Sequence, residues 1–200
     1  MLNNGTYSFN CHKDGKFYAR FEINLIGQHN ILNALASICV ADLLQIRKKD
    51  IIKALKNFKG IERRFQYLNT TKFIVHDYAH HPDEIKAIIN ETQKFYKNKL
   101  LVVFQPHTYS RTKTLIKDFI EAFKSVNEVV IYKTYSAREK YDYKGSACYL
   151  SKKLGTKSKY FRNCEKITNH IIQKINDGYG VLFLGAGDID KLAKNINKLC

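Results

Sequence analysis

The chain has 200 residues, 34 Lys and Arg against 18 Asp and Glu, a formal net charge of +16 and 44% hydrophobic residues. That length suffices for one large domain, or for one complete domain and part of another, and the hydrophobic content excludes wholesale disorder. No apolar run reaches the roughly 18 to 20 residues of a membrane helix, and residues 2–6 carry no secretory signal pattern.

The first sixty residues predict a β-hairpin followed by two helices. Residues 6–26 alternate aromatic and β-branched residues with polar ones around an Asp-Gly turn at 14–15. We expect a helix over 27–46, because apolar residues recur there at helical spacing. The residues expected to share its apolar face are Leu32, Leu35, Ala36, Cys39, Leu43 and Ile46. A shorter helix fits 49–58.

After Gly60 the pattern changes to strands that alternate with helices. The expected strands are 73–78, 100–105, 128–132, 159–162 and 180–184. The expected helices are 82–96, 110–126, 146–154, 165–175 and 189–199. Apolar strands alternating with helices predict an α/β fold with a mainly parallel, doubly wound sheet and helices on both faces. Ligands bind such sheets beyond the carboxyl ends of the strands.

Polar segments follow four of these strands, at 77–81, 107–111, 135–139 and 185–188. The densest cluster, residues 76–82, contains Asp77 and three histidines, His76, His80 and His81. Adjacent His80 and His81 do not easily reach one ion from an extended backbone, so we interpret the cluster as a polar ligand-binding loop and not as a metal site.

The segment 104–112 joins a strand to a helix that carries Arg111, with His107 just before it. A helix N-terminus, a guanidinium and an imidazole together suit a carboxylate ligand. The simpler interpretation is a capping turn through Ser110 or Thr112, and capping and binding are compatible.

Two segments nearer the N-terminus allow two interpretations each. Asn30 and Asn33 share a helix face, and their carboxamides match an adenine edge, but they also fit a helix cap and a solvated asparagine. Arg64 follows another arginine near the change of pattern, where it could reach a phosphate across a cleft or belong to a solvated basic pair.

The remaining motifs exclude several enzyme classes. Residues 185–188 (Gly-Ala-Gly-Asp) lack the third glycine of a dinucleotide loop, so a tight turn with Asp188 as a cap is the default. The 200 residues contain no GxxxxGK[ST], GxSxG or HExxH motif. The chain therefore has no self-sufficient site for ATP hydrolysis, acyl-enzyme chemistry or zinc hydrolysis.

We attribute the positive charge to amino-acid composition, and we use the cysteines to infer the cellular compartment. A basic chain can bind nucleic acid, but these lysines form no block of five or six and accompany abundant Asn and Ile, as in AT-rich coding sequences. We therefore expect no nucleic-acid partner and no membrane insertion. Five cysteines without a Cys-x-x-Cys pair favour a reducing cytoplasm over a disulfide framework.

Taken in order, six segments resemble the Mur ligases of peptidoglycan synthesis. They are GQHNILNALA (27–36), FKGIERRFQ (58–66), DYAHHPDEI (77–85), VFQPHTYSRT (103–112), SAREK (136–140) and GAGDI (185–189). Within that family they are most similar to the ligases that add L-alanine to UDP-N-acetylmuramate. The resemblance implies that ATP phosphorylates the muramoyl carboxylate and that the amine of L-alanine then displaces phosphate.

The resemblance also implies roles for individual residues. Asn30 and Asn33 would contact adenine, with His29 adjacent. Arg64 would reach the ATP phosphates or ribose, and Asp77 would hydrogen-bond the ribose. The residues that would surround alanine or its carboxylate are Tyr78, His80, His107 and Arg111. Arg64 and His107 are the expected catalytic residues. Thr108 stands where some relatives carry arginine, which leaves the carboxylate to Arg111 alone.

By the same resemblance, residues 1–60 are the end of a central ATP-binding domain and 61–200 are a C-terminal Rossmann-like domain. ATP and Mg²⁺ are the implied cofactors, but the phosphate loop and the Mg²⁺ ligands fall outside these residues. We therefore expect no residue of this chain to bind metal, and we expect the chain alone to be inactive. The missing N-terminal part of the ligase is a candidate partner.

Two alternatives stay open: a non-catalytic piece of a split or decaying ligase gene, and the related ligase that recycles murein tripeptide, which segment 103–112 disfavours. We also expect residues 1–60 to be only marginally stable, because missing strands would leave apolar faces uncovered.

Overall fold

The computed structural model describes residues 7–25 and 27–200. The chain divides into two compact units, residues 1–65 and 66–200, and each is described by itself. In the described part of the chain, no helix is long and apolar enough to cross a membrane.

The first unit is a hairpin with two helices, as expected. Strands β1 (Tyr7–Lys13) and β2 (Lys16–Ile23) pair antiparallel around the turn at 14–15. Helices α1 (Gln28–Leu43) and α2 (Lys48–Asn57) follow. The core of this unit is small and consists of Cys11, Ala19, Phe21, Ile38 and Ile51.

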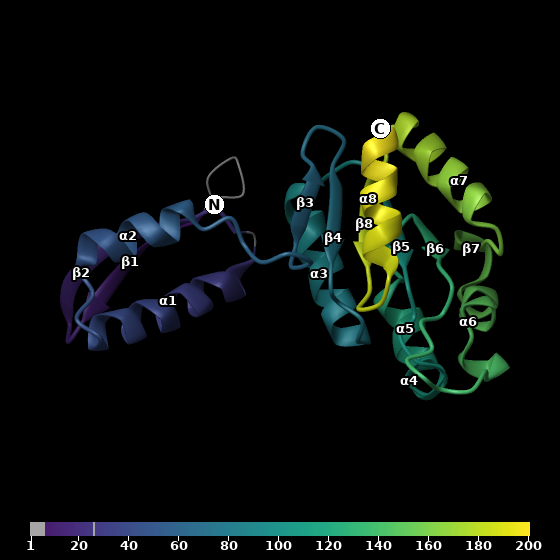
Figure 1. The fold of residues 1–200 in the computed structure, drawn as a ribbon, viewed down its shortest axis with the longest axis horizontal. Coiled ribbons are helices and arrows are strands. Elements are labelled where there is room, and N and C mark those ends of the chain that lie inside the picture. The colour runs from purple at the N-terminus through teal and green to yellow at the C-terminus, as the bar shows by residue number, and fades with distance from the viewer. Residues whose placement is uncertain (1–6, 26) are drawn as a thin grey trace. The chain divides into compact units, whose positions relative to one another are not determined.

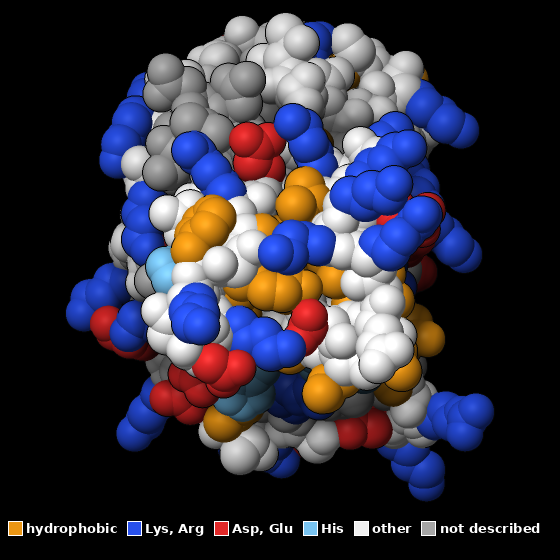
Figure 2. Space-filling model, turned by 90° about the vertical axis from the view of Figure 1, so that its left-hand side faces the viewer, with side chains coloured by type: hydrophobic (Ala, Val, Ile, Leu, Met, Phe, Trp, Pro, Cys, Tyr) orange, Lys and Arg blue, Asp and Glu red, His pale blue; other side chains and the backbone are white. Residues whose placement is uncertain are grey.

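The buried face of α1 is not the face expected from the sequence. Ala34 and Ile38 are buried, whereas Leu32 is 66% exposed and Leu43 is 81% exposed. The other residues of the expected face, namely Leu35, Ala36, Cys39 and Ile46, are exposed as well. Helical spacing identifies an apolar stripe but not the element that covers it. In Figure 2, hydrophobic side chains lie exposed among many Lys and Arg side chains.

The second unit is built on a six-stranded sheet of order β3-β4-β8-β5-β6-β7 (Figure 1). Its strands are β3 (Gln66–Asn69), β4 (Ile74–Asp77), β5 (Leu100–Phe104), β6 (Glu128–Ile131), β7 (Ser158–Tyr160) and β8 (Gly180–Leu184). All neighbouring pairs are parallel except β3 with β4. Strand β3 was not expected, because its four half-polar residues carry no apolar run. The expected α/β fold with a mainly parallel sheet is confirmed.

Helices cover both faces of this sheet (Figure 1). They are α3 (Pro82–Phe95), α4 (Tyr109–Thr114), α5 (Ile116–Ala122), α6 (Ala147–Leu154), α7 (Cys164–Asn176) and α8 (Ile189–Leu199). Successive side chains of β5 point to opposite faces of the sheet. Leu101 and Val103 pack in the cluster formed with α7 and α8. Phe104 packs against Phe119 and Phe123, with ring centroids 5.4 and 5.3 Å apart.

The single helix expected over 110–126 is two helices. The chain bends at Leu115, where φ is −100° and ψ is 23°, so α4 ends there and α5 begins. Within α4 the Thr112 hydroxyl donates to the Thr108 carbonyl at 2.8 Å, a side-chain contact that bends helices. Leu115 is therefore both the C-cap residue of α4 and the N-cap residue of α5.

Candidate functional site

The site lies at the carboxyl ends of β4, β8 and β5. Asp77 and Phe104, the last residues of β4 and β5, both pair with Leu184, the last residue of β8. The loops that follow these three strands therefore start side by side. A bridge between His107 and Tyr135 brings in the segment that follows β6. All four polar segments expected from the sequence thus meet at one edge of the sheet.

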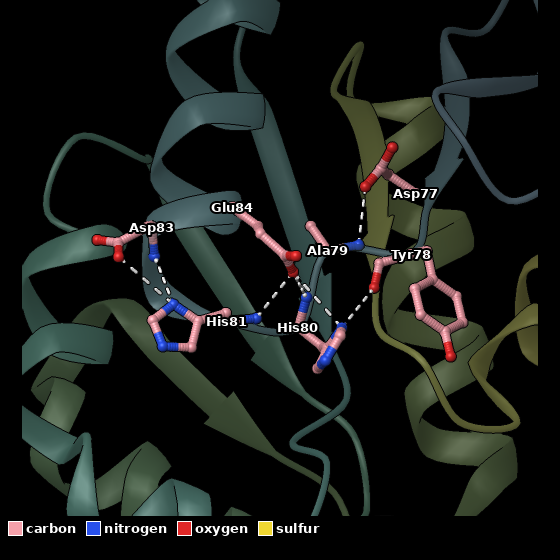
Figure 3. Close-up of polar contacts among 7 residues, drawn as sticks. All are labelled: Asp77, Tyr78, Ala79, His80, His81, Asp83 and Glu84. Atoms are coloured by element: carbon pink, nitrogen blue, oxygen red, sulfur yellow. Dashed lines mark hydrogen bonds and ion pairs between the residues drawn. The ribbon is translucent and has the colours of Figure 1, made fainter.

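The loop after β4 is held by its own polar groups (Figure 3). Asp77 is buried, and its Oδ1 accepts the Ala79 N–H at 2.7 Å. Glu84 Oε2 accepts the N–H groups of His80 and His81 at 3.0 and 3.2 Å. Together with Glu84, the His81 side chain forms a capping box that begins α3. His81 therefore has a structural role at the start of α3.

Four aromatic rings form a row along the edge. The ring centroids of Tyr78 and His80 are 5.4 Å apart, and those of His80 and His107 are 5.7 Å apart. His107 in turn stacks on Tyr135, with centroids 5.3 Å apart and ring planes at 24°. The structure thus brings together three of the residues expected to surround the substrate, from loops that are far apart in the sequence.

His107 and Arg111 present buried nitrogen atoms without a counterpart. His107 Nδ1 and Arg111 Nη1 are both buried and have no hydrogen-bond partner among the described residues. Such atoms are rare, because burying an unpaired polar group is unfavourable, and a polar ligand or a water molecule would satisfy them. Burial, Arg111 and His80 lower the pKa of His107, so its imidazole is neutral at neutral pH. A cation beside a neutral base suits a carboxylate that carries a nearby amine.

We expected the N-terminus of α4 to offer its backbone N–H groups to a ligand, but two of them are already hydrogen-bonded within the chain. Glu139 Oε2 accepts the Ser110 N–H at 2.9 Å, and Thr108 Oγ1 accepts the Arg111 N–H at 3.4 Å. Thr108, not Ser110 or Thr112, is the N-cap residue. Side chains of this chain therefore accept the N–H groups of Ser110 and Arg111. The group that this segment can offer to a carboxylate ligand is the Arg111 guanidinium.

The loop after β8 is a packing turn. Asp188 does not cap α8 with its side chain, contrary to expectation. Its carboxylate instead accepts from Gln105 Nε2 at 2.6 Å and pairs with Lys133 Nζ at 3.0 Å. Gln105 Oε1 accepts the Ile189 N–H, which is the role expected of Asp188. Because a side chain at Gly187 would overlap Gln105 and Tyr135, close packing explains that glycine.

The residues expected to contact adenine, Asn30 and Asn33, lie in the first unit. Asn33 Nδ2 donates to Asn30 Oδ1 at 3.3 Å, so the two carboxamides share a face as expected. The N-cap of α1 is Gly27, so neither asparagine caps the helix. The side chain of His29 lies outside the described residues. Arg64 lies in a turn at the end of this unit, where its N–H donates to the Ile61 carbonyl. The structure does not place these residues relative to the second unit.

Three residues of this edge were not expected individually: Gln105, Tyr135 and Glu139. Gln105 is fully buried at the end of an apolar strand, and a polar residue there is the signal that could have identified it. Tyr135 and Glu139 fall in or beside segment 136–140, but spacing alone does not reveal what they contact. Within residues 7–25 and 27–200, no group of three His, Cys, Asp or Glu side chains could hold a metal ion.

A family model of the Mur ligase glutamate ligase domain matches residues 63–187. The chain belongs to the Mur ligase family. It is 43% identical over 195 residues to the UDP-N-acetylmuramate–L-alanine ligase of Clostridium acetobutylicum, a match that covers 95% of this chain and 43% of that protein. The corresponding ligase of Clostridium tetani is 40% identical, with 94% and 42% covered.

Solved Mur ligases share the fold. The UDP-N-acetylmuramate–alanine ligase of Thermotoga maritima matches with a TM-score of 0.72 and 29% identity, over 94% of this chain and 41% of that one. The MurF ligase of the same organism in complex with ADP matches with a TM-score of 0.66 and 18% identity, over 98% and 45%. The chain therefore spans less than half the length of these four relatives.

Proposed function

We propose that this chain is the C-terminal part of an ATP-dependent, cytoplasmic ligase that joins L-alanine to UDP-N-acetylmuramate through an acyl phosphate. The observation that carries the proposal is the pair of buried, unpartnered atoms, Arg111 Nη1 and His107 Nδ1, at the carboxyl edge of the sheet. The identity of 43% to a ligase of that name supports the choice of substrate.

In this proposal the second unit binds the amino acid. The Arg111 guanidinium binds the alanine carboxylate, and Tyr78 and His80 enclose the side chain and the amine. His107 is neutral and accepts a proton from the ammonium group. The free amine then attacks the acyl-phosphate carbon, a C–N bond forms, and the C–O bond to phosphate breaks. The departing phosphate takes the second proton that the nitrogen loses.

The residues that we propose for ATP binding are Asn30, Asn33, Arg64 and Asp77. Asn30 and Asn33 offer donor and acceptor groups to adenine, with His29 beside them, and the two carboxamides lie close enough to hydrogen-bond each other. Asp77 binds the ribose, and Arg64 binds the phosphates, where it offsets charge that develops in the transition state. Bound ATP supplies the phosphoryl group that activates the carboxylate, and the family's Mg²⁺ is held by residues outside this chain.

The domain assignment implies that another part of the ligase packs against this chain. We assign residues 1–60 to the end of a central ATP-binding domain and 61–200 to the C-terminal domain. The exposed apolar face of α1, with Leu32 and Leu43, supports this assignment, because a stripe of that kind is normally covered by further chain. The missing N-terminal part of the ligase is the partner that would cover it. Without that part we expect no ligation, as for a non-catalytic piece of a split or decaying gene.

Titration of the chain with L-alanine, followed by nuclear magnetic resonance (NMR), tests the amino-acid site. We expect L-alanine to shift the Arg111 Nε and His107 ring resonances of the native chain, and to leave the His107 ring resonances of Arg111→Ala unshifted. His81→Asn, which retains a capping side chain, is the matched control and should bind as the native chain does. A murein tripeptide that binds more tightly than L-alanine would favour the recycling ligase. Turnover of ATP and alanine by the purified chain would contradict its expected inactivity.

A further inference from the structure

Segment 135–139 is the part of this edge that the proposed function does not use. Its backbone is strained, since Ala137 and Arg138 have φ values of 47° and 76° although neither is glycine. Such conformations persist where surrounding contacts hold them, and they gather at functional sites. The contacts that hold this segment lead to the loop after β5.

The first set of contacts runs through the backbone. The Thr108 N–H donates to the Tyr135 carbonyl, and the Tyr135 N–H donates to the Pro106 carbonyl, both at 2.8 Å. The Glu139 N–H closes the segment on the Ser136 carbonyl at 3.0 Å. Segment 135–139 is therefore fastened beside the residues that precede α4.

The second set comes from the Glu139 carboxylate. One oxygen accepts the Ser110 N–H at 2.9 Å, and the other accepts the Ser110 hydroxyl. The hydroxyl contact first, and the backbone contact second, hold the pKa of Glu139 below that of an ordinary glutamate, so it is charged at neutral pH. Glu139 thus binds both donors of the second residue of α4.

Helix α4 needs such a contact. It has six residues and begins after Thr108, a β-branched residue with φ 69°. A helix of that length has little stability of its own, and its cap adopts a conformation that β-branched residues rarely take. An external carboxylate at the first turn therefore decides where the turn lies, and Arg111 is the next residue along it.

Glu139 also acts on the charge of His107. The charged and titratable groups that face His107 are His80, Arg111 and Glu139, with the Tyr135 ring stacked on it. Burial, Arg111 and His80 lower the pKa of His107, whereas Glu139 raises it. Among these three groups, only Glu139 raises the pKa of His107.

We propose that Glu139 is a positioning residue of the amino-acid site, whose carboxylate fixes the first turn of α4 and thereby places the Arg111 guanidinium and the His107 imidazole. The identity of the ligand, a small α-amino acid, rests on the proposed function. The contacts of Glu139 do not.

Three variants of the full chain test this by NMR: Glu139→Ala, Glu139→Gln and Asp142→Asn. Asp142 is the matched control, because its carboxylate also contacts α4, through Lys113 at 2.8 Å, but away from the first turn. Glu139→Ala should move the Arg111 Nε resonance and lower the titration midpoint of His107. Glu139→Gln keeps an oxygen for Ser110, so it should lower the midpoint and leave Arg111 in place. Asp142→Asn should change neither.

L-alanine titrations separate this proposal from the proposed function. Glu139→Ala should weaken binding about tenfold, as expected for one charge-assisted hydrogen bond, and Glu139→Gln should largely restore it. If the native chain binds no L-alanine, the proposed function fails, while the resonances still decide the role of Glu139. Native Arg111 and His107 resonances in Glu139→Ala would overturn the role. Should that variant unfold, an unchanged His107 midpoint in Glu139→Gln would overturn it.

Discussion

Gln105 donates its side-chain amide to Asp188, with Nε2 and Oδ1 2.6 Å apart. The same amide donates to the Lys133 carbonyl at 3.2 Å, and its oxygen accepts the Ile189 N–H at 3.0 Å. One fully buried side chain therefore joins the end of β5 to the loop after β6 and to the start of α8. Three of the four loops of the candidate site, those after β5, β6 and β8, meet at this junction.

Gln105→Leu should destabilise the chain strongly. The change leaves the buried Ile189 N–H without its acceptor and removes one of the two partners of the Asp188 carboxylate, and a buried unsatisfied group costs about 1–3 kcal/mol. We expect the free energy of unfolding to fall by about 3 kcal/mol in urea titrations. Asp188→Asn keeps an acceptor for Gln105 and loses mainly the Lys133 pair, so it should cost about 1 kcal/mol or less. Equal losses of unfolding free energy in the two variants would contradict the role of Gln105 in joining these loops.

Gly187→Ala should displace the Tyr135 ring. A β-carbon at this position would overlap Gln105 Oε1 and lie 2.7 Å from Tyr135 Cγ. We expect a smaller ring-current shift on the His107 ring protons and weaker L-alanine binding. Gly178→Ala is the control, because it meets no atom within 4 Å and carries only the cost of φ +83°. If Gly187→Ala, like the Gly178→Ala control, leaves the His107 shift unchanged, the predicted displacement of the Tyr135 ring is contradicted.

The Glu128 cluster should make stability depend on pH. Burial raises the pKa of Glu128, but hydrogen bonds from Lys174 and His170 and the charge of Lys159 outweigh it, so the net pKa is lowered. The unfolded chain therefore binds this proton more readily. The stabilisation is present above the ordinary glutamate pKa and is lost as the pH falls through the lower, folded value.

Glu128→Gln should remove that dependence. We expect it to lower the free energy of unfolding at pH 7 by about 2 kcal/mol, the typical worth of a hydrogen bond to a charged group, and to flatten the acid limb in urea titrations across pH. Glu121→Gln, whose pair with Lys124 is exposed, should cost about 0.5 kcal/mol or less. A native acid limb in Glu128→Gln would show that other carboxylates set it.

The first unit should exchange its amide hydrogens faster than the second. Its core is small, and α1 exposes Leu32 and Leu43 instead of burying them. Residues 101–104, in contrast, are fully buried in the centre of the sheet. Hydrogen exchange followed by mass spectrometry should show lower protection over 21–40 than over 101–104. Equal protection would mean that the first unit is stable without further chain.

Strand-helix alternation predicted most of the second unit, because apolar strands such as 100–104 are evident in a sequence, but it missed β3 and the break between α4 and α5. Long-range partners were not predictable in the same way. The expected face of α1 was wrong because an apolar stripe does not reveal what covers it. Asp188 was expected as a cap, but Gln105, distant in the sequence, takes that role. His80 and His107 could be placed at one edge from strand order, whereas the contact of Glu139 with Ser110 depends on a strained loop conformation.

The most direct test replaces the matching C-terminal part of the Clostridium acetobutylicum ligase with this chain and measures the KM for L-alanine. We predict alanine-dependent phosphate release by the chimera. In Arg111→Ala the KM for alanine should rise about tenfold to a hundredfold, as for the loss of a charge-assisted hydrogen bond, with the KM for ATP unchanged. Lys113→Ala, on the same helix, should alter neither. A folded chimera without alanine-dependent turnover, or an Arg111→Ala variant with the native KM for alanine, would contradict the account.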